Sequence, residues 1–198
     1  MIIHEFEQRT PEWYAIRFGK ITGSDFFKFM GTSKTSEDKI FEKAAEQITK
    51  QPAVEGFVSV DTERGKTLED TAIFLYEVKT GNVVRQVGFV ERDDLSGCSP
   101  DGLVGDDGMI EVKCPRPAGH IKTVIKGYIK PEYITQIQYN LFICERQWCD
   151  FVSYCQAFGE PHIIRVYRDE DYIAKIKQAL EKAEFQIKAI IEQMGDIK

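Results

Sequence analysis

The chain has 198 residues, of which 42% are hydrophobic, and this length and composition are typical of one domain with a substantial core. Its formal net charge of −6 at pH 7 argues against a surface that coats nucleic acid unspecifically, although bound divalent cations can still create a local site for an anion. The sequence has no apolar run of about 18 residues and does not open on a basic segment followed by an apolar stretch, so we expect neither a membrane span nor a secretory signal.

Helices are predicted for the N-terminal third of the chain. Thr10-Pro11-Glu12 is a typical helix start, with threonine as the cap and proline in the first turn. Thr22–Asp25 is a second start, Ser36 with the two acidic residues after it is a third, and Asp61 or Thr62 begins a fourth helix. Apolar residues of the fourth helix recur at helical spacing: Leu68, Ala72, Leu75 and Tyr76.

Strands are predicted for the centre of the chain, over 83–91, 97–104 and 109–114. A helix then begins at Pro131. Its apolar residues form one stripe: Ile134, Ile137, Leu141 and Cys144.

The last part of the chain is predicted to form two strands, over 148–156 and 162–167, and an amphipathic helix from about 169 to 194. Helices, a strand hairpin, a crossover helix and further strands together imply an α/β fold, with a central mixed β-sheet flanked by helices and an N-terminal helical layer. Because Gly/Ser-rich linkers and internal repeats are absent from the sequence, we expect a single domain over residues 1–198.

The chain contains five cysteines, an odd number without a Cys-x-x-Cys pair, which gives little support to a zinc or iron–sulfur site. We expect reduced and mostly buried thiols at these positions: Cys98, Cys114, Cys144, Cys149 and Cys155.

Three charged residues lie on two adjoining strands that a Gly-Asp-Asp-Gly turn connects. The turn folds the strand after Asp101 back, antiparallel, onto the strand that carries Glu111 and Lys113. Glu111 and Lys113 share one face of their strand because side chains alternate along it. With a three-residue loop we expect Asp101 opposite Lys113 and diagonal to Glu111, all on one face. Diagonal neighbours are about 7–8 Å apart, so the two carboxylates can bind one hard cation.

Two interpretations of these residues stay open on their chemistry alone. One is a metal site with a lysine beside it, and the other is a structural cluster of salt bridges or a solvated strand face. The apolar residues around the hairpin favour the metal site, because a buried pair of carboxylates is costly unless it is paired or bound to metal.

The motif Asp101…Glu111-x-Lys113 resembles that of the PD-(D/E)xK nuclease superfamily, and the blocks around it narrow the resemblance. They occur in the order seen in the lambda-phage exonuclease (YqaJ-like) viral recombinase family, over about residues 10 to 160. The blocks are Ile16–Ser24, Arg64–Glu69, Ser99–Gly102, Glu111–Pro115 and Gln136–Tyr139. The resemblance implies a restriction-endonuclease-like core within a single nuclease domain.

The same resemblance implies a magnesium-dependent 5′→3′ exonuclease. Such an enzyme degrades one strand of linear double-stranded DNA to mononucleotides and leaves 3′ single-stranded tails for single-strand-annealing recombination. It uses two Mg²⁺ ions, with Mn²⁺ as a substitute. The implied partners are double-stranded DNA ends, two further copies of the chain in a homotrimeric ring, and a single-strand annealing protein. The implied location is the cytoplasm of a bacterial cell, with the protein encoded by a phage or prophage.

The resemblance also implies roles for residues of the metal site. Asp101, Glu111 and the Val112 carbonyl would hold the metal, while Lys113 would lower the pKa of the attacking water or stabilise the developing negative charge. Glu69 would complete the metal shell from a facing helix; its alternative is an ordinary exposed glutamate. Gln136 would position the nucleophilic water or Lys113, and its alternative is a solvated helix face.

A second group of residues is implied to bind the 5′-terminal phosphate. Arg17, Ser24 and Ser99 would form the pocket, because arginine forks onto phosphate oxygens and a helix that begins at Ser24 would direct free N–H groups at an anion. Thr22 would assist, and a plain helix cap is the alternative for Ser24. Trp13 would stack on a base near the end of the duplex, or else belong to the core.

Two other functions remain as alternatives to the exonuclease. One is an endonuclease of restriction or repair type on the same core. The other is a DNA-end-binding module without catalytic activity, against which the complete set of Asp101, Glu111 and Lys113 argues.

Overall fold

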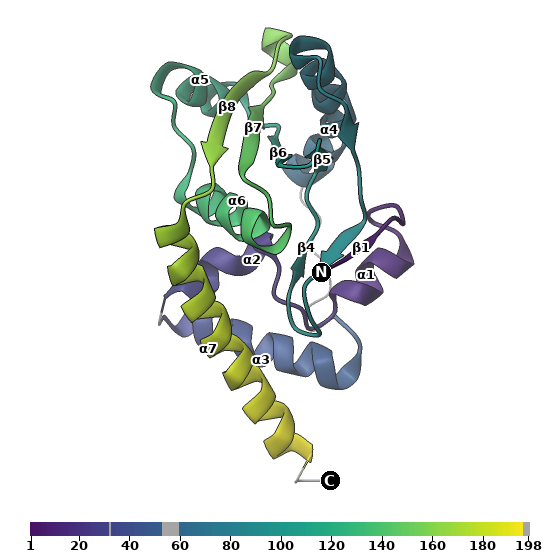
Figure 1. The fold of residues 1–198 in the computed structure, drawn as a ribbon, viewed down its shortest axis with the longest axis vertical. Helices are drawn as coiled ribbons and strands as arrows, with labels where there is room; N and C mark the ends of the chain where they lie inside the picture. Colours follow the sequence, from purple (N-terminus) through teal and green to yellow (C-terminus); the bar gives the residue numbers. More distant parts are fainter. Residues whose placement is uncertain (32, 53–59, 196–198) are drawn as a thin grey trace.

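The computed structural model describes residues 1–31, 33–52 and 60–195, and in the last range it describes side chains from residue 67 onward. Figure 1 shows an elongated molecule in which the C-terminal helix extends away from the sheet. In the described residues, no helix has both the length and the apolar character needed to cross a membrane. All five cysteines are free thiols, and four of them are buried, as predicted.

A five-stranded mixed sheet forms the centre of the fold, with strand order β2-β5-β6-β7-β8. Strand β6 pairs in parallel with β7, and the other pairs are antiparallel. The parallel pair requires a crossover, which is made by the helices α5 (Pro117–Lys126) and α6 (Pro131–Ile143). The strands are β2 (Val84–Arg85), β5 (Gly102–Val104), β6 (Gly108–Lys113), β7 (Trp148–Ser153) and β8 (His162–Tyr167).

A second, three-stranded antiparallel sheet lies beside the first and was not predicted. It consists of β1 (Ile2–His4), β3 (Phe89–Glu91) and β4 (Gly97–Cys98), in the order β1-β3-β4. The predicted strand 83–91 is therefore two strands in two sheets, and so is the predicted strand 97–104. The second break falls at Pro100, which has no N–H to donate to a strand ladder.

The helices of the N-terminal half largely begin where their caps indicate. Thr10 accepts a hydrogen bond from the Trp13 backbone N–H and caps α1, and α3 begins two residues before the predicted start at Ser36. Helix α5 was not predicted. The helices of this half are α1 (Pro11–Arg17), α2 (Gly23–Phe26), the 3-10 helix η1 (Phe27–Met30), α3 (Lys34–Thr49) and α4 (Val60–Thr80).

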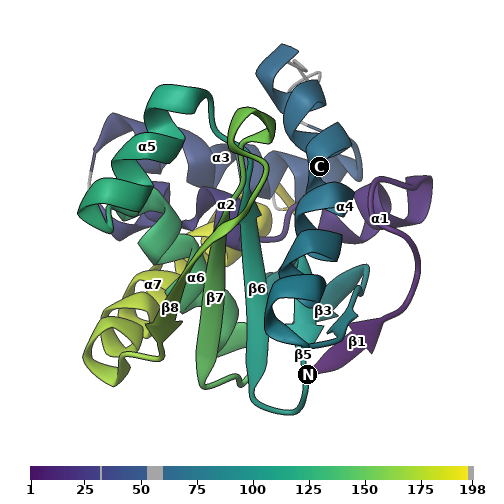
Figure 2. The ribbon, with the colours of Figure 1, turned by 90° about the horizontal axis from the view of Figure 1, so that it is seen from above.

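The remaining helices are α5 (Pro117–Lys126), α6 (Pro131–Ile143) and α7 (Glu170–Gly195), with a short 3-10 helix η2 (Gln156–Phe158) before β8. Helices cover both faces of the five-stranded sheet, α4 on one side and α6 on the other (Figure 2). Helix α7 packs along α3, and α2 packs on α6. This arrangement confirms the predicted α/β fold with a mixed sheet and an N-terminal helical layer.

Alternation along β6 divides its side chains between two hydrophobic clusters. Met109 packs in the cluster that includes residues of α6 and α7, whereas Ile110 and Val112 pack in the cluster that includes residues of α4. Glu111, between Ile110 and Val112, therefore lies on the α6 side of the sheet. Only Lys113, at the end of β6, is not fully buried.

Candidate active site

The hairpin between β5 and β6 brings Asp101 and Glu111 together. Its loop has three residues, and Val104 pairs with Gly108 and Gly102 with Ile110. Continued by one residue, this register sets Asp101 opposite Glu111. The expected position opposite Lys113 was therefore wrong by two residues, because the pairing at the turn determines every pair after it. A shift of two residues preserves the face, so the prediction that all three side chains share one face still holds.

The Asp101 side chain contacts the backbone of β6 directly. Its Oδ2 atom accepts a hydrogen bond from the Val112 N–H at 2.6 Å. The N–H and C=O groups of one residue point to the same side of a strand, so the Val112 carbonyl also lies on the side of Asp101. β5 begins only at Gly102. Three oxygen-bearing groups, from Asp101, Glu111 and Val112, thus lie at the open end of this hairpin, away from its turn.

Glu111 is fully buried, and both of its carboxylate oxygens have partners. The Oε1 atom forms an ion pair with Lys113, and the Oε2 atom lies 3.5 Å from Nδ2 of Asn140 on α6. The Lys113 ammonium also lies 5.2 Å from the centre of the Tyr133 ring, again on α6. The Glu-x-Lys pair is therefore enclosed between β6 and α6.

The electrostatics of the site are those of two carboxylates that share one lysine. Burial, and then the charge of Glu111, raise the pKa of Asp101 from 3.8 to about 7. Burial disfavours the charged form of Lys113, but Glu111 and Asp101 outweigh it and raise the pKa of this lysine above its usual value. Without a further cation, the ionised pair Asp101 and Glu111 is only half neutralised.

Glu69 lies near this pair, on α4. Its Oε2 atom accepts a hydrogen bond from Arg9 Nη2 at 2.6 Å. Burial and the charge of Asp101 raise the pKa of Glu69, whereas Arg9 lowers it. Arg9 has φ +70°, in the left-handed region, and nothing in the sequence marked it as part of the site. The block Arg64–Lys66 lies outside the residues whose side chains are described.

The donor groups fit a hard divalent cation, although they do not form a complete metal cage. Among the described residues, no group of three or more His, Cys, Asp or Glu side chains is close enough to hold a metal ion. Two carboxylates and a backbone carbonyl are, however, the kind of incomplete oxygen shell that Mg²⁺ accepts, because it keeps waters and takes further oxygens from substrate phosphates. The repulsion between Asp101 and Glu111 is what such an ion would relieve.

Three of the five residues expected to bind the 5′-phosphate or the DNA end lie together. Ser99 Oγ accepts hydrogen bonds from Trp13 Nε1 at 2.8 Å and from Arg17 Nη1 at 3.1 Å. The Arg17 guanidinium also stacks on the Trp13 ring, 4.1 Å from its centre. Helix α1 is thereby joined to the segment between β4 and β5, two residues before Asp101. Burial lowers the pKa of Arg17, while the charge of Asp25 raises it.

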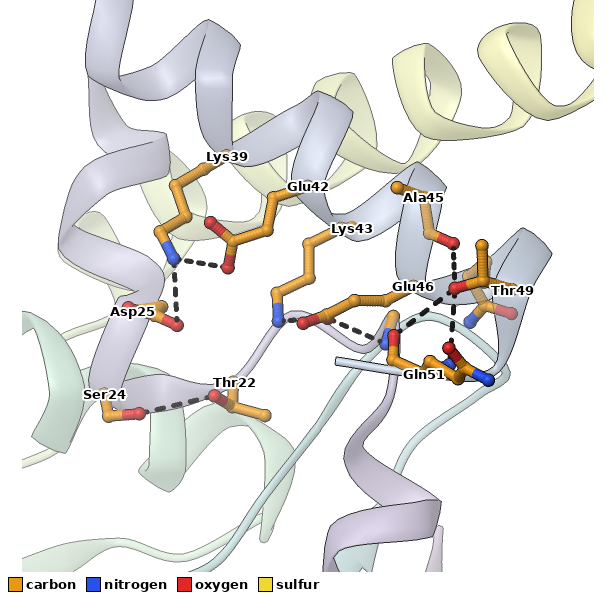
Figure 3. A network of polar contacts seen from close by, with 12 residues as sticks. Thr22, Ser24, Asp25, Lys39, Glu42, Lys43, Ala45, Glu46, Thr49 and Gln51 are labelled. Carbon is orange, nitrogen blue, oxygen red and sulfur yellow. Dashed lines mark hydrogen bonds and ion pairs between the residues drawn. The ribbon is translucent and has the colours of Figure 1, made fainter. Parts of the chain in front are cut away.

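The other two residues of that group, Thr22 and Ser24, contact each other. Their hydroxyl oxygens are 3.4 Å apart (Figure 3). Helix α2 begins at Gly23, so its cap position is Thr22, whose side chain makes no capping hydrogen bond. The helix start predicted within Thr22–Asp25 is therefore confirmed, but Ser24 lies inside the helix and is not its cap, so the alternative role of Ser24 as a plain cap does not hold. With four residues, α2 is also too short to provide a strong dipole.

Figure 3 shows that the lysines of α3 facing this segment are already paired with carboxylates. Lys39 lies 2.5 Å from Glu42 and 3.9 Å from Asp25, and Lys43 lies 2.8 Å from Glu46. Of these pairs, the one between Lys39 and Asp25 links α3 to α2, and the other two lie within α3.

Gln136 is half-buried on α6, between two residues that contact the Glu-x-Lys pair. Tyr133 lies three residues before it and Asn140 four residues after it, so all three share one face of the helix. Gln138 points elsewhere. It donates to the Tyr167 carbonyl and accepts from the Asp169 N–H, just before α7. Asn140 was given no role from the sequence alone, although its spacing of four residues from Gln136 was an available signal.

The comparisons with known proteins agree with this geometry. The model of the YqaJ-like viral recombinase domain matches residues 12–147. The chain belongs to this family. Its fold matches the crystal structure of an alkaline exonuclease, LHK-Exo, from Laribacter hongkongensis, with 35% identity over 94% of this chain and 97% of that chain and a TM-score of 0.87.

Two further structures extend the comparison. LHK-Exo in complex with dAMP matches with 35% identity, over 93% of this chain and 96% of that chain, at a TM-score of 0.86. A phage-related exonuclease from Haemophilus somnus 129PT shares the fold, with 18% identity, 91% and 99% coverage and a TM-score of 0.70. The search of curated proteins found no match. Family and fold together identify the chain as a deoxyribonuclease that resembles the alkaline exonucleases.

Proposed function

We propose that the chain is a magnesium-dependent exonuclease that degrades one strand of linear double-stranded DNA from its 5′ end to mononucleotides. The 3′ single-stranded tails that remain would serve single-strand-annealing recombination. The observation that carries the proposal is the proximity of two groups of residues along the chain. Ser99, which accepts hydrogen bonds from Trp13 and Arg17, lies two residues before Asp101. The Asp101 carboxylate in turn accepts a hydrogen bond from β6 at Val112, next to Glu111.

The metal site of the proposal consists of Asp101, Glu111 and the Val112 carbonyl. Bound there, two Mg²⁺ ions would neutralise charge on the scissile phosphate and make a water nucleophilic. Lys113, held between Glu111 and the Tyr133 ring, stabilises negative charge that develops on the phosphate oxygens. Glu69 supports this site from α4 through the charge it presents to Asp101, and Gln136 faces the site from α6.

Recognition of the DNA end is assigned to Arg17 and Ser99, with Thr22 and Ser24 nearby. A guanidinium half-buried beside a hydroxyl is suited to a terminal phosphate, which it can bind with two parallel hydrogen bonds. Such contacts position the DNA without selecting its sequence. Trp13 would stack on a base near the end of the duplex. The dAMP complex of LHK-Exo supports a mononucleotide as the product, because dAMP is a nucleoside monophosphate.

Assembly and location are further parts of the proposal. A chain with net charge −6 has little general attraction for DNA, so a homotrimeric ring that encloses the duplex would keep it on its substrate. A single-strand annealing protein would take over the 3′ tail. Five free thiols support a reducing compartment, such as the cytoplasm of a bacterial cell that carries a phage or prophage.

The test uses linear duplexes that carry a label on one strand and either a 5′-phosphate or a 5′-hydroxyl. With Mg²⁺, we expect release of mononucleotides from the 5′ end, faster from the phosphorylated duplex, and no release in EDTA. Equal rates for the two ends would remove the phosphate pocket from the proposal. Cleavage of a supercoiled plasmid would favour an endonuclease, and end binding without any release of nucleotides would favour a non-catalytic module.

A further inference from the structure

Asn140 is a buried amide of α6 that lies between the Glu-x-Lys pair and the start of α2. It is 1% exposed, and its Nδ2 atom is 3.5 Å from Glu111 Oε2. Its other polar atom, Oδ1, is buried without a hydrogen-bond partner. A buried carboxamide usually has its oxygen satisfied, so this one requires a physical reason.

The orientation of the amide follows from the charge of its neighbour. A carboxylate only accepts hydrogen bonds, so the NH₂ group of Asn140 has to face Glu111 and the amide oxygen has to face away. On that far side lies Gly23. A Cβ atom at Gly23 would be 2.2 Å from Oδ1 of Asn140, which shows how closely the backbone of α2 approaches the amide.

We propose that Asn140 is a positioning residue for Glu111. Its NH₂ group holds Oε2 while Lys113 holds Oε1, so the carboxylate is fixed at both oxygens. Because Gly23 has no side chain, it leaves room for the side-chain amide of Asn140. Any displacement of the α2 start therefore reaches the metal-binding carboxylate through Asn140. The inference rests on the proposed metal site and gives it a dependence on a residue outside the motif.

The first test measures Mn²⁺ binding to the full chain by titration calorimetry, without DNA. Asn140→Ala and Asn140→Leu both remove the donor, and the second also keeps most of the buried volume. We expect each to weaken Mn²⁺ binding by about tenfold, the usual effect of losing a group that orients a metal ligand. Gln138→Leu is the matched control. It removes a second buried amide of α6 that bonds to the segment before α7, and we expect its Mn²⁺ affinity to equal that of the wild type.

A purely structural role would produce a different result. Both Asn140 variants would then melt at lower temperature, as Gln138→Leu would, but bind Mn²⁺ as tightly as the wild type. That result would overturn the inference and leave the metal site intact. Failure of the wild-type chain itself to bind Mn²⁺ would instead overturn the proposed metal site, and the role of Asn140 with it.

A second test uses Gly23→Ala, which displaces the amide without removing it. The added Cβ meets Oδ1 at 2.2 Å and Cγ at 3.1 Å, while the nearest atom of Tyr139 is 3.3 Å away and needs to move only slightly. We expect Gly23→Ala to weaken Mn²⁺ binding in the wild type and to have no further effect in Asn140→Ala, where the amide is gone. Additive losses in the double variant would contradict coupling through Asn140.

Discussion

The repulsion between Asp101 and Glu111 leads to a prediction about stability without metal. Asp101→Asn removes one of the two charges and keeps an oxygen that can accept the Val112 N–H. In the folded chain the pKa of Asp101 is about 7, compared with 3.8 for the free side chain. A difference of about 3 in pKa corresponds to about 4 kcal/mol, since each unit is worth about 1.36 kcal/mol. This value is an upper limit for the gain, because Asp101 is only half-buried and the variant also weakens the pairing of Lys113.

The pH dependence follows from the direction of the shift. A carboxyl group whose pKa is raised on folding destabilises the folded state once the pH exceeds its unfolded pKa. This loss grows between about pH 4 and pH 7 and is complete above pH 7. We therefore expect Asp101→Asn to be more stable than the wild type in EDTA at pH 8, by up to about 4 kcal/mol, with the gain decreasing towards pH 4.

Urea denaturation in EDTA at several pH values measures this difference, and repeating it with Mn²⁺ provides the matched comparison. The wild type should gain stability from the metal, whereas the variant should gain little, because it lacks one of the carboxylates. The reasoning would be refuted by a variant that is less stable than the wild type at pH 8 in EDTA. It would also be refuted by a gain that does not depend on pH.

Three further predictions concern separate parts of the structure. Lys113→Ala should abolish nucleotide release from labelled linear duplex, because the ammonium acts on the reacting phosphate. Its affinity for DNA ends, measured by gel shift, should stay within about twofold of the wild type. A loss of end binding as large as the loss of nucleotide release would contradict this role. Arg17→Ala should reduce the preference for a 5′-phosphate over a 5′-hydroxyl by about tenfold in kcat/KM, and Trp13→Phe by less, because phenylalanine keeps the ring under Arg17 and loses only the bond to Ser99. Asp150→Ala should lower the free energy of unfolding by about 3 kcal/mol, since it leaves Tyr76 and Arg165 without their shared buried acceptor. The variant should release nucleotides at the wild-type rate at 25 °C, because Asp150 lies on the opposite face of the sheet from Glu111.

Elements that depend on local signals were predicted well. Thr10 and Pro11 determine the start of α1, and the strand at 162–167 coincides with β8. The Gly-Asp-Asp-Gly turn also forms as expected. A turn motif does not, however, specify which residues pair last, and the register of Asp101 was therefore wrong by two residues. The side chains nevertheless stayed on the predicted face, because only an odd shift moves a strand residue to the other side of the sheet.

Contacts between distant parts of the chain left no local signal. Arg9 meets Glu69 across 60 residues of sequence, and Trp13 meets Ser99 across 86. Periodicity and capping describe neighbours along one element, so they cannot indicate which helix start will face which strand end. Only the resemblance to a family grouped Arg17 with Ser99, and it did not indicate that Trp13 would join them through its indole N–H.

The least successful strand prediction coincides with the candidate site. Residues 97–104 have the apolar pattern of one strand, but the chain leaves one sheet after Cys98 and enters the other at Gly102. In a continuous strand, Ser99 and Asp101 would both lie within a ladder, and the Val112 N–H would pair with backbone. The break at Pro100 instead frees Ser99 to meet α1 and lets the Asp101 carboxylate take the place of a backbone acceptor on β6. The local apolar pattern predicts one strand, but the fold breaks it where Ser99 and Asp101 enter the candidate site. Functional sites are where sequence patterns and folds are expected to disagree.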